Sequence, residues 1–107
     1  MRTVNDLIRN FLAEAENDYI GLWMIAPTAR RELGLSSNAD VKARTLDVVR
    51  GLLEHGLWPG DYLRAGFRPW NEPDAAACLA RIDREWDVAK GDPNLGESIC
   101  WLYWKNK

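Results

Sequence analysis

The sequence has few of the residues that build catalytic and metal sites. It has one histidine, His55, and two cysteines, Cys78 and Cys100. A lone histidine beside Gly56, at the end of an expected helix, favours a capping role over a metal site or a catalytic triad. The cysteines do not have zinc-motif spacing, and no glycine-rich phosphate loop is present. We therefore predict a non-enzymatic protein without metal or cofactor, in which both cysteines are small buried side chains.

The sequence also lacks a long apolar run and a large excess of one charge. The longest uncharged apolar stretch extends from Tyr19 to Pro27, whereas a membrane-spanning helix needs about 20 apolar residues. The polar start MRTVND predicts no signal peptide. The formal net charge is −2, which disfavours binding to nucleic acid or to an anionic membrane. We expect one cytoplasmic domain that comprises residues 1–107.

Tryptophan is present in excess. Six tryptophans in 107 residues are more than a core of this size is expected to bury, and tryptophan is enriched at interfaces. The stretch GLWPGDYLRAGFRPW, residues 56–70, combines large aromatics with prolines and glycines. Its WPGD sequence, residues 58–61, predicts a type II turn. Binding residues commonly lie on such irregular backbone.

Helical periodicity dominates the rest of the chain. The expected helices are 4–16, 19–34, 38–55 and 71–91. Gly34 and Gly56 are expected to end the second and third of them. The uncharged aromatic segment SICWLYW, residues 98–104, is the best strand candidate, and we expect it to pair with residues 61–69. The predicted fold class is α+β and mainly helical, with three to four helices and a short two-stranded sheet, an outline similar to that of a winged helix.

Spaced motifs resemble those of a group of small bacterial single-domain proteins. The motifs are GLWPGDY, GFRPW, ARIDREW and GDPNLGESICW within residues 56–101, and DYIGLW at residues 18–23. In that group a DYIGLW helix precedes a GL-x-PGD turn, an F-x-x-W segment, an I-x-x-EW helix and a final I-x-W strand. The resemblance implies a shared fold and no reaction. Proteins of this type resemble immunity proteins for secreted toxins, so it also implies a protein partner.

Two interpretations of the aromatic segment stay open. Its large side chains either seal the helix bundle or bind a partner. We predict binding, with four aromatic anchors, two arginines for bidentate contacts and two acids that steer a basic partner: Trp58, Tyr62, Phe67, Trp104, Arg64, Arg68, Asp61 and Glu72. The expected function is that of an immunity- or antitoxin-like monomer or homodimer that occludes a partner protein, such as a toxin domain. The alternative is a winged-helix-like regulator that binds nucleic acid through its arginines.

Overall fold

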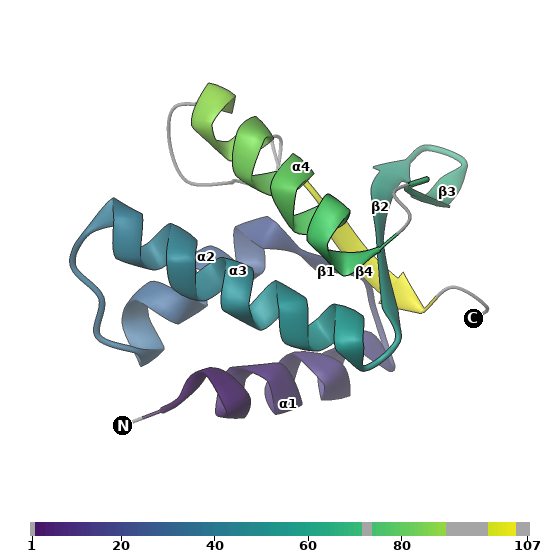
Figure 1. Ribbon diagram of the computed structural model, residues 1–107. Helices are drawn as coiled ribbons and strands as arrows, with labels where there is room; N and C mark the ends of the chain where they lie inside the picture. The colour runs from purple at the N-terminus through teal and green to yellow at the C-terminus, as the bar shows by residue number, and fades with distance from the viewer. Residues whose placement is uncertain (1, 72–73, 90–98, 105–107) are drawn as a thin grey trace.

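The computed structural model describes residues 2–71, 74–89 and 99–104. Its helices and strands follow one another as α1 (Val4–Ala15), β1 (Ile20–Gly21), α2 (Leu22–Glu32), α3 (Asn38–Glu54), β2 (Leu57–Leu63), β3 (Gly66–Pro69), α4 (Ala75–Ala89) and β4 (Trp101–Trp104). The predicted fold class, α+β and mainly helical, is confirmed. The sheet is larger than expected, because four antiparallel strands pair in the order β1-β4-β2-β3. The predicted pairing of residues 98–104 with residues 61–69 is wrong: β4 pairs with residues 57–60 and with β1, because residues 61–69 pair with one another as a hairpin. The tip of the β2–β3 hairpin projects away from α1 and α2 (Figure 1).

The predicted helix stops are confirmed. Gly34 follows α2 with φ +65° and Gly56 follows α3 with φ +105°, left-handed backbone that glycine adopts without the steric cost of a Cβ atom. His55 is the last residue before Gly56, and its Nδ1 lies 2.8 Å from the carbonyl oxygen of Gly51. The only histidine of the chain is therefore occupied at a helix end, where it satisfies a carbonyl group.

Two predictions of local structure are wrong. The second helix begins at Leu22 rather than at Tyr19, because Ile20 and Gly21 pair with β4 as strand β1. The WPGD sequence does not form a turn and lies within strand β2. In both places a backbone pairing between distant segments outweighs a local sequence signal, and sequence periodicity alone does not report such pairing.

Pro59 occupies a strand position at which its missing amide is tolerated. In an antiparallel strand the N and O atoms of one residue face the same neighbouring strand. The carbonyl oxygen of Pro59 accepts a hydrogen bond of 2.9 Å from the amide of Trp70. The proline nitrogen therefore faces the position just beyond β3, which ends at Pro69. Because the β2–β3 ladder ends here, Pro59 removes only one hydrogen bond at its margin.

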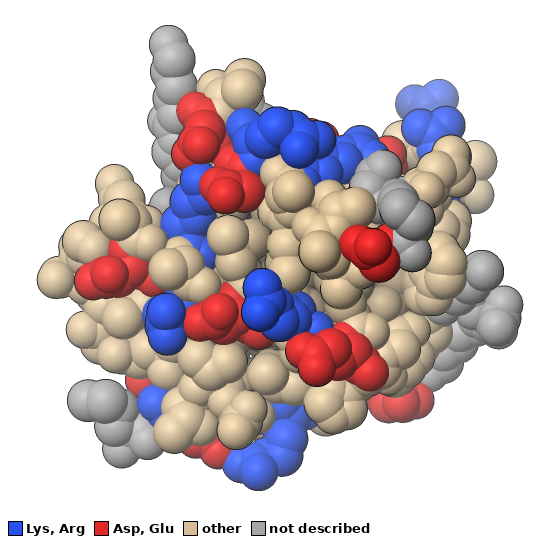
Figure 2. Space-filling view, viewed as in Figure 1, with Lys and Arg blue, Asp and Glu red and all other residues tan. Residues whose placement is uncertain are grey.

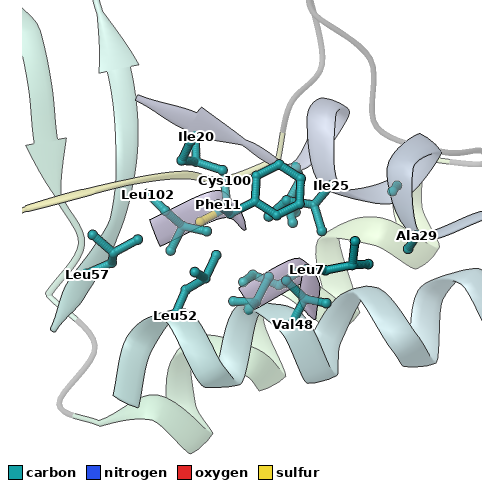
Figure 3. Packing of buried hydrophobic residues seen from close by; sticks show 14 of the residues in the cluster. Leu7, Phe11, Ile20, Ile25, Ala29, Val48, Leu52, Leu57, Cys100 and Leu102 are labelled. Carbon is teal, nitrogen blue, oxygen red and sulfur yellow. The ribbon is translucent and has the colours of Figure 1, made fainter. Parts of the chain in front are cut away.

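The core lies between the helices and one face of the sheet. Leu7 and Phe11 of α1, Val48 and Leu52 of α3, and Leu102 of β4 meet there (Figure 3). Both cysteines are buried thiols, as predicted. Burial strongly raises the pKa of the Cys100 thiol, which keeps this side chain protonated and unreactive.

One lysine joins α3 to α4. The Lys42 ammonium lies against the carboxylates of Asp83 and Asp87, with an Nζ–Oδ1 distance of 2.5 Å to Asp87. Hydrogen bonds to Asp83 and then to Asp87 raise the pKa of Lys42. Two carboxylates on α4 therefore hold this cation and neutralise its charge.

Thr45 leads to a first prediction, on stability. It is fully buried on α3, and its Oγ1 has no hydrogen-bond partner among the described residues. Burial of a hydroxyl group without a hydrogen-bond partner destabilises the folded state, because the group loses its hydrogen bonds to water; burial of a methyl group has no such cost. We expect Thr45→Val, which keeps the shape, to raise the free energy of unfolding by about 1 kcal/mol in urea denaturation.

Thr45→Ser is the matched control for this prediction. It keeps the hydroxyl and removes only the methyl group, so we expect it to lower the free energy of unfolding. If the valine variant were as stable as the original chain or less stable, the hydroxyl would have a partner that offsets its burial.

Candidate functional site

The sheet has one face toward the core and one face away from it. Side chains alternate between the two faces of a strand. In β4, Leu102 is buried in the core, whereas its neighbours Trp101 and Tyr103 point the other way and are half-buried. We call the face that carries Trp101 and Tyr103 the outer face.

All three tyrosines of the chain meet on this outer face. The ring centroid of Tyr19 lies 4.6 Å from that of Tyr62 and 4.2 Å from that of Tyr103. Phe67 of β3 lies 5.9 Å from Tyr19 and 6.0 Å from Tyr103, and Trp101 lies 5.3 Å from Tyr62. These distances suit edge-to-face and tilted ring packing. We call Tyr19, Tyr62, Phe67, Trp101 and Tyr103 the outer aromatic cluster.

Two glycines let the rings of this cluster approach the backbone. A Cβ atom on Gly60 of β2 would lie 2.7 Å from the ring of Phe67 and 2.5 Å from the carbonyl oxygen of Arg68. A Cβ atom on Gly21 of β1 would lie 2.9 Å from the ring of Trp101. The rings therefore cover the positions that side chains would occupy at these glycines, a packing that stabilises glycines within a sheet.

The outer aromatic cluster is only partly covered. Tyr62 is 51% exposed, and the other four members are half-buried. Within the part of the chain that the structure describes, the tyrosine hydroxyls form no hydrogen bond with protein groups. Tyrosines of this kind bury an apolar ring and present a polar tip, a combination enriched at protein interfaces.

The structure brings together two of the predicted anchors, Tyr62 and Phe67, which face each other across β2 and β3. Sequence reasoning missed the other three cluster members. The alternation within WLYW could have placed Trp101 and Tyr103 on one face of a strand. Tyr19 had no such signal, because its segment has helical periodicity and its strand pairing depends on a distant partner.

Asp61 and Arg68 lie on the opposite face of the hairpin from the cluster. They are cross-strand partners, with Arg68 Nη2 and Asp61 Oδ2 3.8 Å apart. Asp61 Oδ1 also accepts a hydrogen bond of 3.2 Å from the indole Nε1 of Trp70. Arg64 is exposed in the turn of the hairpin, outside both groups. Asp61 therefore holds neighbouring side chains of its own chain.

The remaining predicted anchors have other surroundings. Trp58 is the cross-strand partner of Tyr103 and so shares the outer face of the sheet; it is half-buried and also lines a pocket of about 200 Å³ with residues of α3 and α4, among them Leu53 and Cys78. Trp104 packs against the core, and among the described residues its buried indole nitrogen has no hydrogen-bond partner. Glu72 lies outside the described residues. The predicted set is thus divided among several places and does not form one surface.

The aromatic side chains differ in how far they are exposed. Trp70 and Trp86 are 4% and 6% exposed, and the other four tryptophans are half-buried. Tyr62, at 51%, is the most exposed aromatic side chain that the structure describes. The expectation that some large aromatic rings lie at the surface therefore holds most clearly for Tyr62, one of the predicted anchors.

Charges of both signs are interspersed on the face shown in Figure 2. Among the described residues no group of three metal-ligating side chains is found, and no described helix is long and apolar enough to cross a membrane. Comparison of the chain with protein-family models, with curated proteins and with solved structures finds no match.

Proposed function

We propose that this chain is a non-enzymatic protein-binding domain that docks through its outer aromatic cluster. The observation that carries the proposal is the gathering of all three tyrosines, with Phe67 and Trp101, on the sheet face away from the core. Clusters of tyrosine and tryptophan with an exposed member have the composition of interface hot spots. Their rings lose little conformational entropy when they are covered, because each has only two side-chain torsions.

The ion pairs support a protein partner over the alternative of a nucleic acid. Lys42 is held between two aspartates of α4, and Arg44 lies 3.1 Å from Asp47. Nucleic-acid binding depends on cations that replace the counterions of phosphates. Cations that are already paired with carboxylates of their own chain contribute less to that exchange, so these two residues do not favour a winged-helix regulator.

The proposed role is that of an immunity-like protein in the cytoplasm that occludes the active site of a toxin domain. It rests on the spaced motifs quoted above, and the outer aromatic cluster supplies a surface suited to it. A net charge of −2 is compatible with a basic partner, since opposite charges accelerate the encounter of two proteins.

Co-expression with the product of the adjacent gene tests this function. If that product arrests bacterial growth, we expect this chain to restore growth and to co-purify with the terminal domain of the toxin. The matched control is the Tyr62→Ala variant, produced in equal amount, which should restore growth less. If the chain neither bound nor protected against any toxin encoded beside it, the immunity role would be wrong.

A further inference from the structure

The outer face of the sheet has no charged side chain at its described strand positions. By alternation and strand register, these positions are Gly21, Trp58, Gly60, Tyr62, Phe67, Pro69, Trp101 and Tyr103. Among the described residues, no arginine or lysine lies over a ring of the outer aromatic cluster. The π faces of aromatic rings attract cations, so this surface can accept a cation that comes from another molecule.

Acidic side chains border this surface where α1 ends. Glu14, Glu16 and Asp18 are exposed and lie directly before Tyr19 of the outer aromatic cluster. The amide of Asp18 donates to the carbonyl oxygen of Glu14 at 3.1 Å, and Asp18 Oδ1 accepts a hydrogen bond of 2.8 Å from the amide of Tyr19. Glu14 and Asp18 form no ion pair with any residue that the structure describes. Two carboxylates without a cation of their own are therefore held beside the cluster.

The helix dipoles add to the negative potential at this border. Helices α1 and α3 run in the same direction, and both end on the side of the molecule where β2 begins (Figure 1). The last turns of these two helices contain no basic residue, and α3 ends with Glu54. A helix C-terminus carries a partial negative charge that favours cations and repels carboxylates. The arrangement therefore destabilises the free chain slightly, and a cation supplied by a partner would relieve the repulsion.

We propose that the outer aromatic cluster docks an arginine-bearing segment of the protein partner, with a guanidinium beside Asp18 and Tyr19. This partner chemistry rests on the proposed function, that of docking through the cluster. A guanidinium stacks on aromatic rings and also pairs with carboxylates through two parallel hydrogen bonds, and the border of the cluster offers both. Asp61, expected from the sequence to steer a basic partner, holds Trp70 instead. Glu14 and Asp18 take over that steering role.

Titration of the chain with a short peptide of alternating glycine and arginine tests the proposal, followed by NMR of ¹³C-labelled tyrosine rings. We expect saturable shifts of the tyrosine signals with a dissociation constant in the millimolar range. The same peptide with citrulline in place of arginine keeps the planar side chain and removes the charge, so it should bind about fivefold more weakly. Equal binding of the two peptides, or no saturable shift with the arginine peptide, would overturn the proposal.

Asp18→Asn and Asp40→Asn form a matched pair of variants for this titration. Each removes one exposed carboxylate that has no ion pair with a described residue, but Asp40 lies in the first turn of α3, at the opposite end of that helix. The asparagine side chain at position 18 can still accept the hydrogen bond from Tyr19. We expect Asp18→Asn to weaken binding of the arginine peptide about threefold and Asp40→Asn to leave it unchanged. Equal weakening by both variants would show attraction by net charge alone and would overturn the proposal.

A chain that ends at Trp104 provides a further test, because Lys105 and Lys107 follow β4 in the sequence. We expect this chain to bind the arginine peptide with equal or higher affinity, since the loss of two cations does not weaken the attraction of another. Weaker binding would contradict the proposed role of the acidic border. These titrations are independent of the growth-protection experiment, so a partner that binds without an arginine contact would leave the proposed function in place.

Discussion

Tyr62→Ala is expected to weaken binding to the protein partner by at least tenfold, measured by isothermal titration calorimetry. The ring is 51% exposed, yet it is supported by Tyr19 and Trp101 at centroid distances of 4.6 and 5.3 Å. A supported, exposed ring of this kind is typical of hot spots, whose truncation costs about 2 kcal/mol or more in binding. The same change removes ring contacts in the free chain, so its free energy of unfolding should fall by only about 1 kcal/mol.

Leu63→Ala is the matched control for this experiment. Leu63 is the next residue of β2, is 40% exposed, and lies on the opposite face of the strand because side chains alternate. We expect this variant to bind the partner with unchanged affinity. If Leu63→Ala weakened binding as much as Tyr62→Ala, the docking surface would not be the outer aromatic cluster.

Gly60→Ala is expected to lower the free energy of unfolding by about 3 kcal/mol, the upper part of the range for overpacking. The added Cβ atom would lie 2.5 Å from the carbonyl oxygen of Arg68 and 2.7 Å from the Phe67 ring. A ring can turn aside, but the carbonyl belongs to the paired strand β3 and cannot move without loss of the β2–β3 register. Urea denaturation followed by circular dichroism measures this change.

Gly34→Ala separates crowding from backbone strain. Gly34 has φ +65°, and a Cβ atom there would meet nothing within 4 Å. Its replacement should therefore cost only the left-handed conformation, about 1 kcal/mol. Equal losses for the two variants would contradict the close approach of Phe67 and Arg68 to Gly60.

Local signals predicted the helices well, because each depends on residues a few positions apart. The stops at Gly34 and Gly56 need only a residue that tolerates positive φ. The buried cysteines were predictable from their residue type. Such features depend on residue propensity and on the local spacing of apolar residues, and both can be determined from a single sequence.

The candidate site was less predictable, because it depends on strand pairing over long sequence separations. Tyr19 joins the outer aromatic cluster only because β1 pairs with β4, about 80 residues further along the chain. The WPGD sequence is typical of a turn, yet it lies within strand β2, because β2 pairs with β3 on one side and with β4 on the other. Trp104 was assigned with Tyr62 from composition, which does not determine the face on which a side chain lies; Trp104 packs against the core instead.

The docking surface is tested most directly by labelling the tyrosine rings of this chain with ¹³C. Because the chain has three tyrosines and all of them lie in the outer aromatic cluster, every labelled signal reports on the same surface. Addition of the unlabelled partner should shift or broaden all three signals, Tyr62 most strongly, and should leave the ring signal of Phe11 in the core unchanged in a second sample with labelled phenylalanine. Tight binding with all three tyrosine signals unchanged would contradict the proposed mode of docking.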